Sequence, residues 1–283
     1  MVARLEPARS RRSAPVLRCD RHHAAGGVPG LDASDLGRPV AHRTDRKEIA
    51  VATDRILVIV TNAGEYEKVG YRTGLWLGEL THFYDYVTEQ GYTVDIASPA
   101  GGFVPIDPES LAHDVLADLG TDRRYRDREF MDLLDRTRSI GEVEVEDYDA
   151  IYFTGGHGVM FDFGGDDLGA LTAAFHDSGR VVSAVCHGPV GLLNVPLESG
   201  AALIAGRRVT GFSWPEEEAA QRADAVPFNL QDELVKVGAD YSMADEPFGV
   251  HVVTDGRLIT GQNPASARGV AEAVVAALRG DQR

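Results

Sequence analysis

The sequence predicts an α/β fold in which a mostly parallel, flavodoxin-like sheet lies between layers of helices as a three-layer sandwich. Short apolar runs at residues 56–60 and 181–185 are typical of strands buried on both faces. These runs alternate with longer segments whose apolar residues recur at helical spacing, and strand–helix alternation favours a parallel sheet. Ligands of such folds bind beyond the carboxyl ends of the strands.

Composition limits the class of protein. The chain has 283 residues, of which 43% are hydrophobic and 25% charged, so it can bury a substantial core. The formal net charge of −16 argues against a nucleic-acid partner. No run approaches the roughly 18 apolar residues of a membrane span. The chain has two cysteines, too few for a disulfide framework or a multi-cysteine zinc site, so we expect no metal. The composition as a whole predicts a cytoplasmic protein.

The first 50 residues differ from the rest. They hold ten basic and six acidic residues, a net charge of +4 that leaves −20 for the remainder. Because they show no apolar periodicity, we predict a disordered extension over 1–52 and a single α/β domain over 53–283. A transit peptide and a biological start near Val51 are the alternatives.

In the first half of the domain, apolar spacing and glycine stops predict each element. Residues 75–90 form a predicted helix because Trp76, Leu80, Phe83 and Val87 share one face, and Gly91 ends it. The strand at 56–60 precedes this helix, with a loop over 62–74, and a second strand follows at 93–97. Residues 107–139 are polar with weak helical patterning, which predicts an inserted helical segment at about 107–140.

The second half repeats the pattern. Asp255-Gly256 is a strong hairpin turn between two predicted strands. A helix is expected to begin directly after Cys186. The predicted strands are 150–153, 181–185, 208–210, 250–254 and 257–260, and the other predicted helices are 168–178 and 264–278.

Cys186 is the predicted nucleophile. A β-branched strand stops there and a helix is expected within one or two residues, which requires a sharp, strained turn that projects the side chain into the cleft. The N-terminus of that helix is expected to lower the pKa of the thiol. The alternative is that Cys186 is simply a small buried hydrophobic residue.

Two further groups complete the predicted chemistry. Glu79 lies on the apolar face of its helix, where desolvation raises the pKa of a carboxyl and suits it to carry protons near neutral pH. The alternative is that Glu79 lies at the edge of the apolar face, where its carboxyl would reach water. His187 is not expected to fold back onto its neighbour, so it needs an acid from elsewhere. The run 216–218 offers three glutamates, and the sequence alone does not choose among them.

A glycine-rich strand end supplies backbone donors. The N–H groups of Gly155 and Gly156, with that of His187, are placed to bind an oxyanion. A phosphate-binding loop is excluded because the Lys-Ser/Thr ending is absent. His157, beside these glycines, is interpreted as positioning or structural.

These stretches resemble the ThiJ/PfpI superfamily, relatives of class I glutamine amidotransferases, and above all its branch of glutathione-independent glyoxalases and heat-shock holding chaperones. The resemblance covers residues 55–278. It rests on residues 74–83, 155–163, 184–189, 210–212 and 254–266.

The resemblance implies a role for each site residue. Cys186 would be the nucleophile, His187 the triad histidine, and Glu79 the carboxyl that shares a proton with the thiol. Spacing from Gly211-Phe212 puts the triad acid at Glu217, although Trp214-Pro215 departs from the family pattern and keeps Glu216 as a rival. The oxyanion donors fall on Gly156 and His187, and we expect Trp214 to form a wall of a tight pocket.

The resemblance also implies a reaction, the conversion of methylglyoxal to D-lactate through a hemithioacetal and an enediol. It needs no glutathione, nicotinamide, metal or other cofactor. The expected partners are a small dicarbonyl substrate and a second copy of the chain in a homodimer. The alternatives are a holding chaperone for unfolded proteins, a cysteine peptidase or deglycase of the same superfamily, and, more remotely, a glutaminase or a redox sensor.

Overall fold

The computed structural model describes residues 53–280, so the predicted extension at 1–52 lies outside the described residues. A seven-stranded sheet forms the centre of this unit, in the order β3-β2-β1-β4-β5-β9-β8. Every pairing in it is parallel except that of β8 with β9. The strands are β1 (Arg55–Ile59), β2 (Thr93–Ser98), β3 (Arg138–Ser139), β4 (Ala150–Phe153), β5 (Val181–Val185), β8 (Val252–Asp255) and β9 (Leu258–Gly261).

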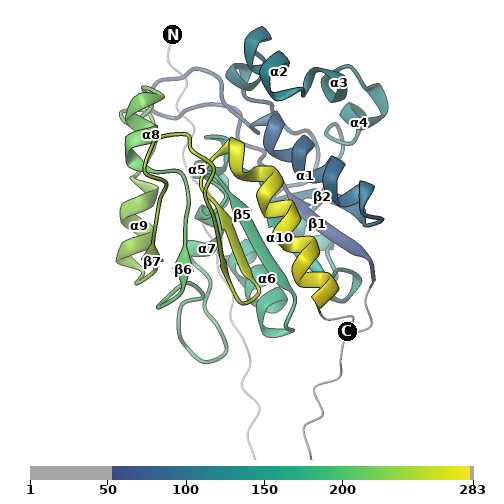
Figure 1. The fold of residues 1–283 in the computed structure, drawn as a ribbon, viewed down its shortest axis with the longest axis vertical. Helices are drawn as coiled ribbons and strands as arrows, with labels where there is room; N and C mark the ends of the chain where they lie inside the picture. Colours follow the sequence, from purple (N-terminus) through teal and green to yellow (C-terminus); the bar gives the residue numbers. More distant parts are fainter. Residues whose placement is uncertain (1–52, 281–283) are drawn as a thin grey trace, which may run out of the picture. The chain divides into compact units, whose positions relative to one another are not determined.

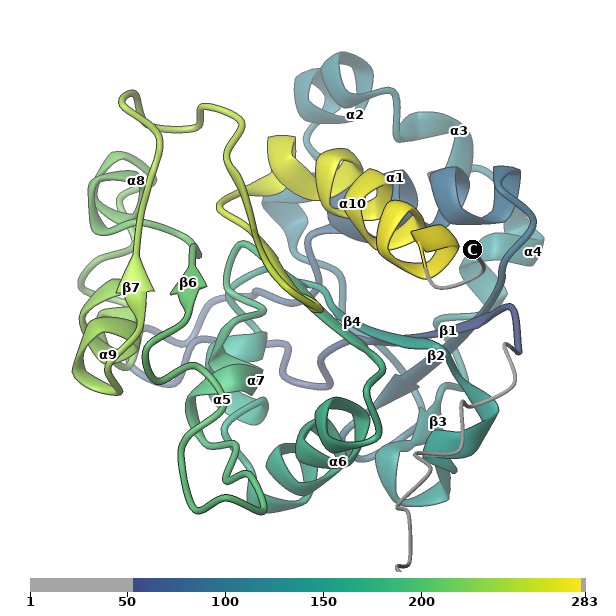
Figure 2. The same cartoon turned by 60° about the horizontal axis from the view of Figure 1, so that its bottom comes forward.

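Helices cover both faces of the sheet, which confirms the predicted fold class (Figures 1 and 2). On one face, α1 (Leu77–Glu89) lies beside α10 (Ala267–Gly280), which follows the short 3₁₀ turn η4 (Pro264–Ser266). On the other face lie α5 (Val159–Asp162), α6 (Asp166–Asp177), α7 (Val190–Leu193) and α9 (Leu230–Lys236).

The two apolar cores follow from the alternation of side chains along each strand. Ile56 and Val58 face the α1–α10 layer, whereas Leu57 and Ile59 face the opposite layer. Because both sets are fully buried, the strand reads as a continuous apolar run. This arrangement explains why the buried strands were predictable from short apolar segments alone.

Several helices and strands of the structure differ from the predicted ones in their bounds or pairing. The helix expected at 75–90 begins at Leu77, because Leu75 forms a parallel β-bridge with Ile106 and Trp76 has an extended backbone as the N-cap. The strand expected at 208–210 leaves the main sheet: β6 (Arg208–Val209) pairs with β7 (Asp240–Tyr241) in a separate two-stranded sheet. The hairpin at Asp255-Gly256 is confirmed by the antiparallel pairing of β8 with β9.

The segment between β2 and β4 contains short helices that pack near α1 (Figure 1). Asp85 of α1 pairs with Arg123 and Arg124 of this segment at 2.9 and 2.6 Å. The helices are η1 (Pro108–Leu111), α2 (His113–Leu119), α3 (Asp122–Tyr125), α4 (Arg128–Asp132), η2 (Ile140–Glu142) and η3 (Val145–Asp147).

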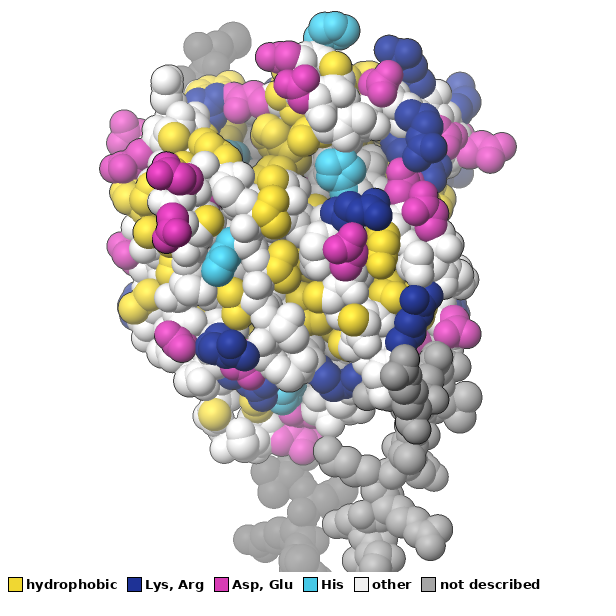
Figure 3. All heavy atoms as spheres, in the orientation of Figure 1, with side chains coloured by type: hydrophobic (Ala, Val, Ile, Leu, Met, Phe, Trp, Pro, Cys, Tyr) yellow, Lys and Arg dark blue, Asp and Glu magenta, His cyan; other side chains and the backbone are white. Residues whose placement is uncertain are grey.

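Charged side chains of both signs are interspersed on the face shown in Figure 3. On α10, which lies on this face, Arg268 pairs with Glu272 at 3.1 Å. None of the helices in residues 53–280 combines the length and apolar character needed to cross a lipid bilayer.

Candidate active site

The carboxyl ends of three neighbouring strands meet at one edge of the sheet. β1, β4 and β5 are parallel and adjacent, so the segments that follow them converge. Cys186 follows β5 directly and has a φ of +58°, in the left-handed region that a non-glycine residue seldom adopts. Its N–H donates to Gly261 O at 2.9 Å, and its carbonyl accepts from the N–H of Phe212 at 2.7 Å. These two bonds hold the predicted sharp turn.

The helix expected directly after Cys186 is only partly present. A turn occupies the next residues, and α7 spans just Val190–Leu193. The expected lowering of the thiol pKa was wrong. Burial is the main cause that raises the pKa of Cys186 well above its usual value, and the charge of Glu79 adds to it. A hydrogen bond from the backbone of Gly156 opposes this shift.

Glu79 projects from α1 into the same site and is fully buried. Its Oε2 accepts from the N–H of Gly155 at 2.6 Å, and its Oε1 has no hydrogen-bond partner among residues 53–280. Burial raises the pKa of Glu79 to about 8, although hydrogen bonds with Cys186 and Gly155 counteract it. The carboxyl therefore holds a proton at neutral pH, and it lies within reach of the Cys186 thiol.

His187 connects the thiol to a carboxylate. Its Nδ1 lies 3.3 Å from Cys186 Sγ, and its Nε2 lies 2.8 Å from Glu217 Oε2. The expectation that His187 cannot reach its neighbour was wrong, because the left-handed backbone at Cys186 turns both side chains to one side. Burial lowers the pKa of His187, and the nearby His157 lowers it further. The ring is therefore neutral near pH 7, as a general base must be.

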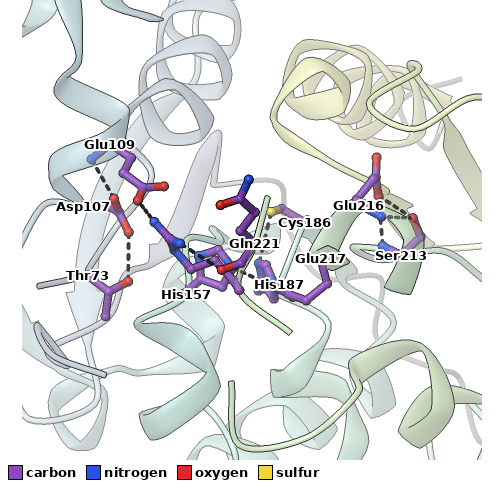
Figure 4. A network of polar contacts seen from close by, with 11 residues as sticks. Thr73, Asp107, Glu109, His157, Cys186, His187, Ser213, Glu216, Glu217 and Gln221 are labelled. Carbon is purple, nitrogen blue, oxygen red and sulfur yellow. Dashed lines mark hydrogen bonds and ion pairs between the residues drawn. The ribbon is translucent and has the colours of Figure 1, made fainter. Parts of the chain in front are cut away.

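Glu217 binds a second histidine as well (Figure 4). Its Oε1 lies 2.7 Å from Nε2 of His157, whose ring centre is 4.4 Å from that of His187. Burial alone would raise the pKa of Glu217, but the charge of His187 and the hydrogen bonds of both histidines lower it to about 2. The three residues bring possible metal-ligand atoms within 4.8 Å of one another, yet Nε2 of each ring is already hydrogen-bonded to the carboxylate.

Glu216, the rival acid, points elsewhere (Figure 4). Its Oε2 accepts from the N–H and hydroxyl of Ser213, the N-cap of α8 (Trp214–Ala219), at 2.9 and 2.8 Å. Its Oε1 accepts from the N–H of Phe248 and from Nδ2 of Asn263, both at 2.8 Å. This fully buried carboxylate joins three segments and makes no hydrogen bond with either histidine.

Two backbone donors lie beside the sulfur. The N–H of Gly156 is directed at Cys186, and the N–H of His187 donates no hydrogen bond within residues 53–280. Gly156 has a φ of +92°, and a Cβ added there would lie 2.3 Å from Gly74 O. Only glycine therefore lets the backbone approach so closely.

Trp214 does not lie where it was expected. Its half-buried side chain packs against the core on the α5–α9 face, whereas Cys186 belongs to the opposite core. The aromatic groups beside the histidines are Phe212, 4.5 Å from the His187 ring centre, and Tyr66, 5.5 Å from that of His157. Sequence reasoning missed both, although Phe212 stands in a stretch that carried the resemblance.

Asp162 is a further residue that the sequence did not single out. It accepts from the hydroxyl of Thr61 at 2.8 Å and from the N–H of Asn62 at 2.7 Å, which fixes the end of β1 beside the site. Burial raises its pKa to about 6, against the effect of these hydrogen bonds. It also lies in a stretch that carried the resemblance, at 155–163.

Comparison with known proteins gives a consistent family. Residues 74–277 match the sequence profile of the DJ-1/PfpI family. Glyoxalase 3 of Candida albicans is 33% identical over 234 residues, which cover 79% of this chain and 98% of the relative. Glutathione-independent glyoxalase HSP31 of Saccharomyces cerevisiae is 32% identical over 240 residues, which cover 81% of this chain and 100% of the relative.

Two solved structures have a similar fold. The X-ray structure of Rapid Encystment Protein 24 kDa of Francisella tularensis is similar at a TM-score of 0.75 and 37% identity, over 79% of this chain and 98% of that one. The crystal structure of glyoxalase III of Candida albicans is similar at a TM-score of 0.71 and 31% identity, over 80% and 97%.

Proposed function

The chain belongs to the DJ-1/PfpI family, and we propose that it acts there as a glutathione-independent glyoxalase that converts methylglyoxal to D-lactate. One observation carries this proposal: Cys186 at a strand end is linked through His187 to Glu217 and lies beside the protonated Glu79. The relatives named Glyoxalase 3 and Glutathione-independent glyoxalase HSP31 support the choice of reaction. The cysteine is only 3% exposed, which favours a small carbonyl over a peptide.

The proposed reaction begins with attack of the sulfur on the aldehyde carbon. We assign the neutral His187 ring a proton on Nε2, which donates to Glu217, so that Nδ1 is free to take the thiol proton. The negative charge of Glu217 stabilises the imidazolium that forms. The aldehyde oxygen becomes an oxyanion facing the N–H groups of Gly156 and His187. The proton of Glu79 converts it to a hemithioacetal and leaves Glu79 ionised, so that it can act as a base in the next step.

The second step moves a hydrogen between two carbons. A base, His187 or Glu79, removes the proton from the former aldehyde carbon to give an enediol, and the neighbouring carbon is then protonated. The first carbon is oxidised to a thioester and the second is reduced to an alcohol, so no external oxidant or reductant is used. Glu79 suits this step because its pKa is about 8. Water then hydrolyses the thioester, which releases lactate and restores the thiol.

The test is D-lactate formation from methylglyoxal without added glutathione, by the wild type and Cys186→Ala. The matched control is Cys19→Ala, which removes the only other cysteine of the chain. We expect turnover by the wild type and Cys19→Ala and none above background by Cys186→Ala. Turnover that survives Cys186→Ala would contradict cysteine catalysis, and a reduced wild type without turnover would contradict the glyoxalase assignment.

Three further predictions accompany this function. The D-lactate dehydratase chemistry places the enzyme among the lyases. A homodimer is expected from the superfamily, and sedimentation of the purified chain measures it. We also expect a cytoplasmic location.

A holding chaperone for unfolded proteins is the alternative without enzymatic chemistry, and suppression of aggregation by Cys186→Ala would support it.

A further inference from the structure

The cysteine site lies beneath two layers of side chains. Tyr66 packs against the His157 ring, and Asp107 is close enough to His157 for their charges to interact. Both are buried, with 1% and 2% exposure. Further out lie Tyr71, 42% exposed, and Glu109, whose side chain is 51% exposed. Figure 4 shows Asp107 and Glu109 on the same side of the site as His157.

Arg222 joins the pieces of the outer layer. Its guanidinium forms an ion pair with Glu109 and lies 5.3 Å from the ring centre of Tyr71. Tyr71 belongs to the loop after β1, Glu109 to the inserted segment, and Arg222 to the chain after α8. One side chain, 17% exposed, thus holds three separate segments together over the buried Tyr66.

The backbone attaches Arg222 to the triad acid. Helix α8, which carries Glu217, has Ala220 as its C-cap and is followed by Gln221 at a φ of +59°. The N–H of Arg222 donates to Glu217 O at 3.1 Å. This is the hydrogen-bond pattern of a left-handed helix end. The turn at Gln221 therefore joins Arg222 directly to the helix that carries the triad acid.

Building on the proposed function, we propose that Arg222 is a specificity-determining residue whose contacts with Glu109 and Tyr71 form a gate that admits small carbonyl compounds to Cys186 and slows larger ones. The described arrangement is the closed gate, because the thiol behind it is 3% exposed. Nε of Arg222 is buried without a partner among residues 53–280. An unsatisfied buried donor makes the closed arrangement less stable, which keeps opening accessible.

The test measures access to the thiol directly in the full-length chain. Alkylation of Cys186 by iodoacetamide and by the bulkier N-phenylmaleimide is followed by mass spectrometry of digests, with Cys19 as the reference in each digest. Glu109→Gln removes the ion pair and is expected to accelerate alkylation about two- to five-fold, the range for an exposed pair. Arg222→Gln also removes the Tyr71 contact, so it is expected to accelerate alkylation further. The gain should be larger for the bulkier reagent.

The two variants separate a gate from an electrostatic effect. Removing the negative charge of Glu109 favours the thiolate, whereas removing the positive charge of Arg222 disfavours it. A gate predicts acceleration in both, and electrostatics alone predicts opposite changes. Asp132→Asn is the matched control, because it breaks the Arg128–Asp132 pair in the same segment at a carboxyl that is 53% exposed.

Alkylation rates equal to the wild type in both folded variants would overturn the gate, as would equal acceleration by Asp132→Asn. In turnover assays, Glu109→Gln is expected to raise kcat/KM for phenylglyoxal relative to methylglyoxal. If the wild type forms no lactate while the alkylation rates change as expected, the glyoxalase assignment fails and the gate stands.

Discussion

Two buried acids dominate the chemistry at the scale of single residues. Burial is the largest cause that opposes ionisation of both Cys186 and Glu79, and Glu79 further raises the pKa of the thiol, whereas the hydrogen bond with Cys186 lowers that of Glu79. The pair therefore keeps its protons at neutral pH, and a neighbouring base is needed to create the thiolate. His187 is the group within reach, with Nδ1 3.3 Å from the sulfur.

Glu79→Gln should change how stability depends on pH. The pKa of Glu79 rises from 4.5 to about 8 on folding, so its stabilising contribution is fully present below pH 4.5 and is lost as the pH rises toward 8. Relative to the neutral glutamine variant, the wild type should lose about 1.4 kcal/mol per pH unit within this window. Urea unfolding at pH 5, 6, 7 and 8 measures it. The control is Glu89→Gln, an exposed carboxyl on the same helix, and parallel curves for the wild type and Glu79→Gln would refute the prediction.

The two neighbouring glutamates should separate activity from stability. Glu217→Gln removes the charge that stabilises the imidazolium of His187, so kcat for D-lactate formation should fall by about 10²- to 10⁴-fold. Glu216→Gln leaves its buried donors poorly paired and should cost about 1–3 kcal/mol of unfolding free energy, with kcat changed less than about tenfold. Equal kcat values in the two folded variants would rule out Glu217 as the triad acid.

At the scale of elements, the turn after β4 places backbone where no side chain fits. A Cβ added at Gly155 would lie 2.6 Å from Glu79 Oε2, 2.8 Å from Cys186 Cβ and 2.9 Å from His187 N. This turn therefore fixes the spacing between α1 and the strand-end cysteine. The lack of room for a side chain explains why glycines follow β4.

Gly155→Ala is expected to fold and to lose activity. Its methyl group must push Glu79 or Cys186 aside, and a displacement of about 1 Å can cost roughly 100-fold in rate. Gly164→Ala is the control, because a Cβ there meets nothing within 4 Å. Circular dichroism checks folding and lactate formation gives the rate. A Gly155→Ala enzyme with wild-type kcat would show that this close packing is not required.

At the scale of the whole molecule, the inserted segment depends on α1 for its position. Arg124 pairs with Asp85 at 2.6 Å and with Asp127 at 2.8 Å, and its guanidinium lies over the rings of Tyr84 and Phe130. The segment that contains Asp107 and Glu109 is thus also anchored near its middle, by Arg124.

Arg124→Ala should loosen that segment without unfolding the sheet. Loss of the ion pairs and of the stacking on aromatic rings is worth about 1–2 kcal/mol. Amide hydrogen exchange in residues 113–132 should then become about tenfold faster, while β1, β4 and β5 remain protected. Arg126→Ala is the control, since that side chain is 76% exposed and its one ion pair within residues 53–280 is with Asp122. Equal exchange in the two variants would contradict this role of Arg124.

The sequence by itself determined the buried central strands, the sheet class and the position of the cysteine, but not the short strands β3 and β7. β4 and β5 coincide with the predicted segments 150–153 and 181–185, because strands buried on both faces need continuous apolar runs that are visible in one dimension. The strand-end turn at Cys186 was also predictable, since a turn that ends a strand is a local property. Helical spacing put Glu79 among apolar neighbours, and the family resemblance implied that it shares a proton with the thiol.

Only the tertiary structure decided which groups meet. It brings Glu217 rather than Glu216 to His187, adds His157 to the same carboxylate and directs Trp214 to the opposite core. It also reverses the expected shift of the thiol pKa, because burial and Glu79 outweigh a helix of only four residues. Side-chain direction at a helix start, desolvation and the contacts of Arg222 all depend on segments distant in the chain, so no local pattern encodes them.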